Sequence, residues 1–95
     1  MAYDCTETVA RQSLAHIRPF YERDPKMPLS YVMCLHYIAL EPGISLTDLS
    51  KKLNIQLPTV SRIIRALEDE HLIDVKTAKN ERRRKELFLI KDGIF

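Results

Sequence analysis

The clearest hydrophobic pattern in the chain begins just after residue 57. Apolar side chains recur there at positions i, i+3, i+4 and i+7, the spacing of one helix face, namely Val60, Ile63, Ile64 and Leu67. Pro58 suits the first turn of such a helix, because the N–H that proline lacks would have no intrahelical partner there. The pattern predicts a helix that buries one side and leaves its polar side chains on the other.

A shorter predicted helix comes immediately before this one. Ser45 and Asp48 fit a capping box, in which the two residues satisfy exposed backbone donors reciprocally. The helix they open carries an apolar stripe of Leu46, Leu49 and Leu53. Asn54 then tolerates a left-handed backbone conformation, and residues 55–57 form a short link. Together the two helices predict a helix-turn-helix over residues 45–70.

Beyond this helix the pattern changes from helical spacing to alternation. Ile73, Val75 and Thr77 alternate with charged residues, which predicts a half-buried strand. Leu87 and Leu89 alternate in the same way after a polar, basic stretch. We therefore expect a β-hairpin over residues 72–90.

The first predicted helix covers residues 4–21. Asp4 or Thr6 suits its N-cap, and Pro19 is expected to bend or end it. Its loose apolar face consists of Val9, Leu14, Ile17 and either Phe20 or Tyr21.

A second helix is expected over residues 30–40, after a connector that contains two prolines. Ser30 suits its N-cap, and the Pro-Gly pair at 42–43 ends it. Its apolar side chains at helical spacing are Tyr31, Cys34, Leu35 and Ile38. The order of elements predicts one domain over residues 1–95, mainly α with a small β-hairpin wing (α+β), that is, a winged helix-turn-helix.

Composition excludes several classes of protein. The 95 residues are 45% hydrophobic and 29% charged, which is ordinary for a single globular domain. The two cysteines have no metal-ligand spacing, the three histidines are scattered, and no nucleophile or phosphate-loop motif occurs. We therefore expect that the protein is not an enzyme and that it binds no cofactor and no metal. No apolar run approaches the roughly 18 residues that span a membrane, so we expect a cytoplasmic protein, associated with the nucleoid of a prokaryotic cell or of one infected by a virus.

Charge is distributed unevenly along the chain. The net charge is +2, but residues 1–50 hold four basic and six acidic side chains, and residues 51–95 hold eleven and seven. Residues 76–85 alone hold six basic side chains against Glu81. Such asymmetry indicates either a polyanionic partner or a solvated charged loop, and charge alone leaves both open.

The outward side of the predicted second helix of the helix-turn-helix carries the side chains that a DNA major groove favours. Hydroxyl groups suit phosphates or bases, and arginine suits guanine edges or phosphates. No acidic residue interrupts this side before Glu68, which argues against an ordinary solvated face. The candidate recognition residues are Gln56, Leu57, Pro58, Thr59, Ser61, Arg62 and Arg65.

The tip of the predicted hairpin supplies a second basic element. Arginine side chains insert favourably into a narrow, negative minor groove. Glu81 is expected to pair with Arg82 or Arg84 and so to brace the loop. The candidate wing contacts are Lys79, Arg82, Arg83, Arg84 and Lys85. Helix and wing together predict binding to double-stranded DNA.

From about residue 29 to residue 93 the chain resembles the MarR family of bacterial transcription regulators. Residues 46–53 (LTDLSKKL) and 59–62 (TVSR) are similar to its two helix-turn-helix helices, and residues 81–83 (ERR) to its acidic-Arg-Arg wing motif. The resemblance implies that Arg83 enters the minor groove and that Glu81 braces the wing. Gln56 and Leu57 stand where the family commonly has small polar residues.

The resemblance implies a sequence-specific DNA-binding transcription regulator, which we expect to be a repressor. It also implies a homodimer. Family members continue into long C-terminal helices that build the dimer and an effector pocket, whereas this sequence ends at Phe95. We therefore do not extend the family's small-molecule effector to this chain. We expect the dimer interface to involve the first helix, the second helix or the C-terminal tail.

Three other functions stay open. A winged-helix protein-interaction adaptor is one, since fold alone does not fix function. A DNA-binding protein of plasmid or phage replication or partition is another. The third is peroxide sensing through Cys5, by analogy with some members of the family.

Overall fold

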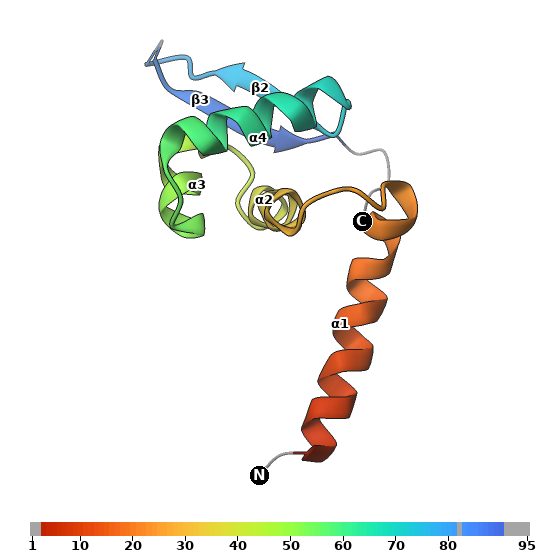
Figure 1. Cartoon of the computed structure of the whole chain (residues 1–95). Helices are drawn as coiled ribbons and strands as arrows, with labels where there is room; N and C mark the ends of the chain where they lie inside the picture. The colour runs from red at the N-terminus through yellow and green to blue at the C-terminus, as the bar shows by residue number, and fades with distance from the viewer. Residues whose placement is uncertain (1–2, 82, 91–95) are drawn as a thin grey trace.

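The computed structural model describes residues 3–81 and 83–90, with side chains from residue 6 onward. Apart from the short strand β1, its elements follow the expected order, as Figure 1 shows. They are α1 (Tyr3–Arg23), α2 (Leu29–Leu40), β1 (Ile44–Ser45), α3 (Leu46–Leu53), α4 (Leu57–Asp69), β2 (Ile73–Thr77) and β3 (Lys85–Leu89). The helical body with its small sheet confirms the winged helix-turn-helix. No helix in the described ranges is long and apolar enough to cross a membrane.

The sheet has three strands in the order β1-β3-β2, and both pairings are antiparallel. The predicted hairpin forms β2 and β3, with Val75 opposite Leu87. The sequence did not predict β1, whose Ile44 pairs with Leu87 from the other side. By pairing with β3, strand β1 holds the start of α3 beside the base of the wing.

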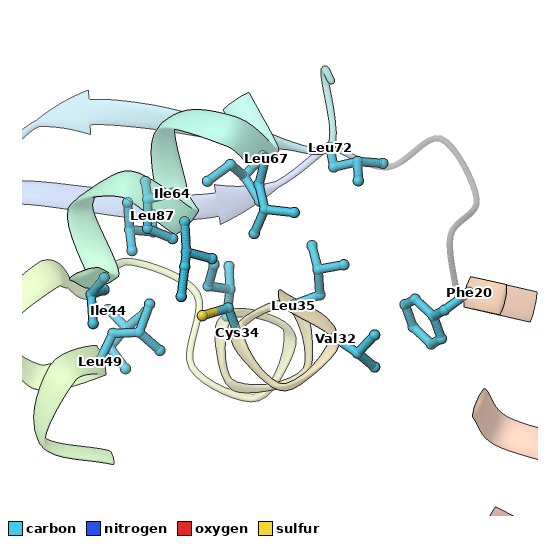
Figure 2. Close-up of a cluster of buried hydrophobic side chains, with 14 residues drawn as sticks. Phe20, Val32, Cys34, Leu35, Ile44, Leu49, Ile64, Leu67, Leu72 and Leu87 are labelled. Carbon is cyan, nitrogen blue, oxygen red and sulfur yellow. The ribbon is translucent and has the colours of Figure 1, made fainter. Parts of the chain in front are cut away.

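The core lies between α2, α3, α4 and the sheet, and Figure 2 shows side chains from all of them meeting there. The predicted stripe of α4 is confirmed, because Val60, Ile63, Ile64 and Leu67 are all buried. On α2 the buried side chains are Val32, Cys34, Leu35 and Ile38. Each fully buried aliphatic side chain contributes about 1.5–3 kcal/mol, so this core fixes the position of α4 firmly.

Helix α1 stands out from the body, as the red and orange helix of Figure 1 shows. Of its predicted apolar face only Phe20 is buried, whereas Val9, Leu14, Ile17 and Tyr21 are between 42% and 61% exposed. Two exposed ion pairs at i,i+4 spacing, Arg11 with Glu7 and Arg18 with Glu22, lie along it. The helix therefore presents an unpartnered apolar stripe in the described structure.

Helix α1 continues past Pro19 to Arg23, two residues beyond the predicted end at residue 21, so the proline does not end the helix. Proline removes one backbone hydrogen bond, but Phe20 packs into the core directly after it. The N–H of Asp24 also donates to the carbonyl of Phe20 at 3.0 Å, which extends the helical bonding past the proline. The suggested N-caps, Asp4 and Thr6, lie inside the helix.

Helix ends elsewhere follow the sequence more closely. Helix α2 begins one residue early, at Leu29, with Pro28 at its N-cap, so Ser30 lies inside it. Ser45 caps α3 as predicted, because its Oγ accepts a hydrogen bond from the Asp48 N–H at 3.1 Å. The reciprocal bond of the capping box is not present among the described residues.

Candidate nucleic-acid interface

The turn between α3 and α4 sets the position of α4, the candidate recognition helix. Asn54 adopts the predicted left-handed conformation, with φ 56° and ψ 43°. The N–H of Ile55 donates to the carbonyl of Ser50 at 3.2 Å, and Ile55 packs against the core. This tight turn lets α3 support α4 while the outward side of α4 stays uncovered.

The side chains on that outward side lie where the sequence predicts. Arg62 and Arg65 are exposed, Thr59 and Ser61 are half-buried, and Leu57 is 43% exposed. The ion pairs found among the described residues include neither arginine. No acidic residue lies in the first turn of the helix. Both guanidinium groups are therefore available to a partner.

Gln56 and Pro58 lie beside Leu57 at the N-terminal end of α4. Gln56 is the N-cap residue, yet its side chain makes no capping hydrogen bond, and Pro58 lies in the first turn. Both residues are exposed. An amide that does not cap its own helix can donate to and accept from the edge of a base.

The wing loop is closed by backbone hydrogen bonds. The N–H of Ala78 donates to the carbonyl of Arg84 at 2.8 Å, and the N–H of Arg84 donates to the carbonyl of Glu81 at 3.0 Å. Glu81 was predicted to pair with Arg82 or Arg84. The ion pairs of the described residues do not join Glu81 to Arg84, and Arg82 lies outside the described residues. Exposed cationic side chains surround this turn, namely Lys79, Arg83, Arg84 and Lys85.

A hollow of about 370 Å³ joins the recognition helix to the wing. Leu57 borders it from α4, and Arg83, Arg84 and Lys85 border it from the wing. The remaining wall consists of Glu81 and the start of α3, namely Ser45, Leu46, Thr47 and Asp48. Cationic side chains thus face the leading end of the recognition helix across an open space.

The hollow divides the predicted site residues into two groups. It gathers Leu57 with most of the wing, whereas the other described candidates do not line it, namely Gln56, Pro58, Thr59, Ser61, Arg62, Arg65 and Lys79. Sequence reasoning missed the contribution of α3, although the capping box that it identified marks the very residues, Ser45 to Asp48, that form the wall. The two-residue strand β1 brings them there, by pairing Ser45 with Glu86 next to the wing.

Cys34 adds no chemistry to this surface. Cys34 is fully buried in α2, and burial raises the pKa of its thiol from 9.0 to about 11. A thiol with a raised pKa is a poor nucleophile at neutral pH. The side chain of Cys5, the candidate peroxide sensor, lies outside the described residues. Among the residues that are described, no group of three or more His, Cys, Asp or Glu side chains is arranged to hold a metal ion.

Comparison with known proteins identifies relatives of this chain. The MarR family model matches residues 28–85, which run from the start of α2 to the end of the wing loop. The HTH-type transcriptional regulator PetP of Rhodobacter capsulatus is 29% identical over 59 residues, which are 62% of this chain and 36% of PetP. The chain thus matches a little over a third of the length of that relative.

Solved structures share the fold over nearly the whole chain. The MepR–DNA complex of S. aureus has a TM-score of 0.74 at 24% identity, covering 95% of this chain and 73% of MepR. FabT of Streptococcus pneumoniae, solved in complex with DNA, has a TM-score of 0.73 at 20% identity, covering 93% and 63%. Because the family model matches well over half of the sequence, the chain belongs to the MarR family.

Proposed function

We propose that this protein binds double-stranded DNA in a sequence-specific manner, with α4 in the major groove and the wing in the adjacent minor groove. The observation that carries the proposal is the hollow that α4, α3 and the wing share, with three basic side chains on its rim. A sugar-phosphate strand separates each major groove from the next minor groove. A protein that places α4 in one groove and the wing in the next needs an open, cationic space between them for that strand.

The dimensions and charges suit this arrangement. The major groove is about 12 Å wide and admits an α-helix. Arg62 and Arg65 on α4 would contact base edges or phosphates, and Thr59 and Ser61 offer hydroxyl groups beside them. Arg83 is our candidate for insertion into the minor groove, whose negative potential favours a guanidinium group. Glu81 would hold the loop through its backbone bond to Arg84 and through a pair with Arg82.

We propose further that the protein acts as a homodimer through α1. The stripe of Leu14, Ile17 and Tyr21 at helical spacing is exposed, and it runs into an apolar hollow of about 210 Å³ at the root of the helix. Leu29 and Met27 of the α2 region border the same hollow. A second copy would cover this surface and place two recognition helices on half-sites about 34 Å apart.

Occupation of an operator by such a dimer would block access of RNA polymerase, so repression is the regulatory outcome we propose. The protein would act in the cytoplasm, on the nucleoid. MepR and FabT, whose folds this chain shares, were both solved with DNA, which supports the nature of the partner.

The test is selection of bound duplexes from a random-sequence library, followed by a salt titration of the Kd. We expect one enriched sequence with two similar halves, and a log–log slope near roughly −5 for about six phosphate contacts. A Kd that does not depend on salt, or retention of no duplex, would contradict the proposal and favour a protein-interaction adaptor.

A further inference from the structure

Leu57 is an apolar side chain that borders a hollow lined mostly by charged and polar side chains. It is the first residue of α4, it is 43% exposed, and it lines the hollow opposite Arg83 and Lys85. Among the described residues it is neither in the core nor in the set of half-buried side chains packed on the core. Single exposed leucines are common on protein surfaces, so its position has to supply the argument.

Leu57 lies at the N-terminal end of α4, at the border between the hollow proposed for the sugar-phosphate strand and the part of the helix proposed to enter the major groove. Ser61 and Arg65 follow Leu57 at i+4 and i+8, so the three residues lie along one side of α4. This side therefore presents an apolar group first, then a hydroxyl group, then a guanidinium group. The N-terminal residues of a recognition helix are the ones that reach base edges in the major groove.

Only one DNA base offers an apolar group in that groove. Thymine carries a C5-methyl group there, whereas the other three bases offer hydrogen-bond donors and acceptors. A leucine side chain cannot form hydrogen bonds, and it gains by removing a methyl group and its own surface from water. The neighbours of Leu57 in the chain, Gln56 and Pro58, are exposed, and neither adds an acidic group that would repel DNA.

We propose that Leu57 is a specificity-determining residue that contacts the C5-methyl group of one thymine in each half-site. This inference rests on the proposed DNA binding. It predicts discrimination by a methyl group alone, at one base pair, independent of any hydrogen bond. Loss of one buried methyl group corresponds to an affinity loss of about fourfold.

The experiment uses the full chain and the duplex that it enriches from a random-sequence library. Each thymine of that duplex is replaced in turn by deoxyuridine, which removes only the methyl group, and the Kd is measured by fluorescence anisotropy. We expect one thymine per half-site at which the replacement weakens binding by about fourfold. In Leu57→Ala the thymine and deoxyuridine duplexes should bind equally.

Two further variants separate readout from folding. Leu57→Met keeps an apolar side chain of similar length and should keep the sensitivity to deoxyuridine. Ser61→Ala changes the neighbouring residue on the same side and should also keep it, at whatever affinity it shows. Far-UV circular dichroism and the Tm establish that Leu57→Ala folds, which we expect because the site is exposed and alanine favours helices.

The outcomes distinguish this inference from the proposed function. If the chain enriches a duplex and Arg83→Ala weakens its binding, but no deoxyuridine replacement has an effect that Leu57→Ala removes, the role of Leu57 is refuted and DNA binding stands. If no duplex is enriched, both fall. A second check uses 5-methylcytosine: placed where the thymine stood, with guanine opposite, it should bind more tightly than cytosine to the wild type and equally to Leu57→Ala.

Discussion

The left-handed residue in the helix-turn-helix provides a sharp test of how the recognition helix is placed. Asn54 has φ 56° and ψ 43°, and its side chain is exposed. In this conformation the Cβ of an ordinary L-residue approaches the following carbonyl oxygen, at a cost of roughly 1–2 kcal/mol. Asparagine tolerates it better than most residues, and glycine has no Cβ at all.

We therefore expect Asn54→Val to lower the free energy of unfolding by about 2 kcal/mol, because valine is also branched at Cβ. Asn54→Gly should stay within about 1 kcal/mol of the wild type, since relief of strain is offset by the greater freedom of glycine in the unfolded chain. For a domain of this size, 1 kcal/mol corresponds to a Tm shift of roughly 4–8 °C.

Urea unfolding and thermal unfolding, followed by circular dichroism at 222 nm, measure both variants against the wild type. The glycine variant should bind the selected duplex with unchanged affinity well below its Tm, because it preserves the backbone of the turn. If valine and glycine gave the same free energy of unfolding, the left-handed turn would not be present in solution, and the placement of α4 described above would be wrong.

The remaining predictions concern the wing, the helix ends, the buried thiol and the projecting helix. Arg83→Ala should weaken binding to the selected duplex by roughly 1–3 kcal/mol in a gel-shift titration, whereas unchanged affinity would remove the wing from the interface. His71 also has a positive φ of 61° and is exposed, so His71→Gly should raise the Tm, and a fall would mean that the histidine side chain stabilises the turn. Burial raises the thiol pKa of Cys34 to about 11 in the folded state, so the stability that the thiol contributes is fully present below pH 9 and is lost as the pH rises from 9 towards 11. The free energy of unfolding of Cys34→Ala should therefore depend less on pH across that interval than that of the wild type. Equal dependence would contradict the burial of the thiol. Leu14→Glu should yield a monomer in sedimentation equilibrium, with its circular dichroism spectrum retained, and a variant that stays dimeric would exclude α1 as the interface.

The helix-turn-helix and the wing can be predicted from sequence because their patterns are dense and local. Four apolar residues at helical spacing fix which side of α4 is buried, and the alternation at Ile73, Val75 and Leu87 fixes the two wing strands. Asn54 marks the turn through a conformational preference that belongs to the residue itself. In each case a few neighbouring side chains decide the structure.

The exposure of α1 and the existence of β1 could not be predicted in the same way. Strand β1 has two residues, too few for alternation to appear, and pairing with the distant Leu87 creates it. On α1 the apolar residues predict a buried face, but Leu14 and Tyr21 are each 61% exposed. Sequence patterns report which residues favour burial and do not report what covers them.

The candidate site was predictable as a set of residues and unpredictable as a shape. Arginine type and spacing identify α4 and the wing separately. The meeting of Leu57 with Arg83 and with Thr47 around one hollow depends on the sheet register and on β1. For this reason the contribution of α3 emerges only from the structure.

Chemical-shift mapping by NMR tests most directly whether α4 and the wing form one DNA-binding surface. The uniformly ¹⁵N-labelled chain is titrated with the duplex that it enriches, and amide shifts are followed residue by residue. We predict the largest changes over residues 56–65 and 79–85, with smaller changes at residues 45–48, and none along the exposed part of α1. Changes confined to α1 and α2, or to the wing without α4, would contradict a shared interface.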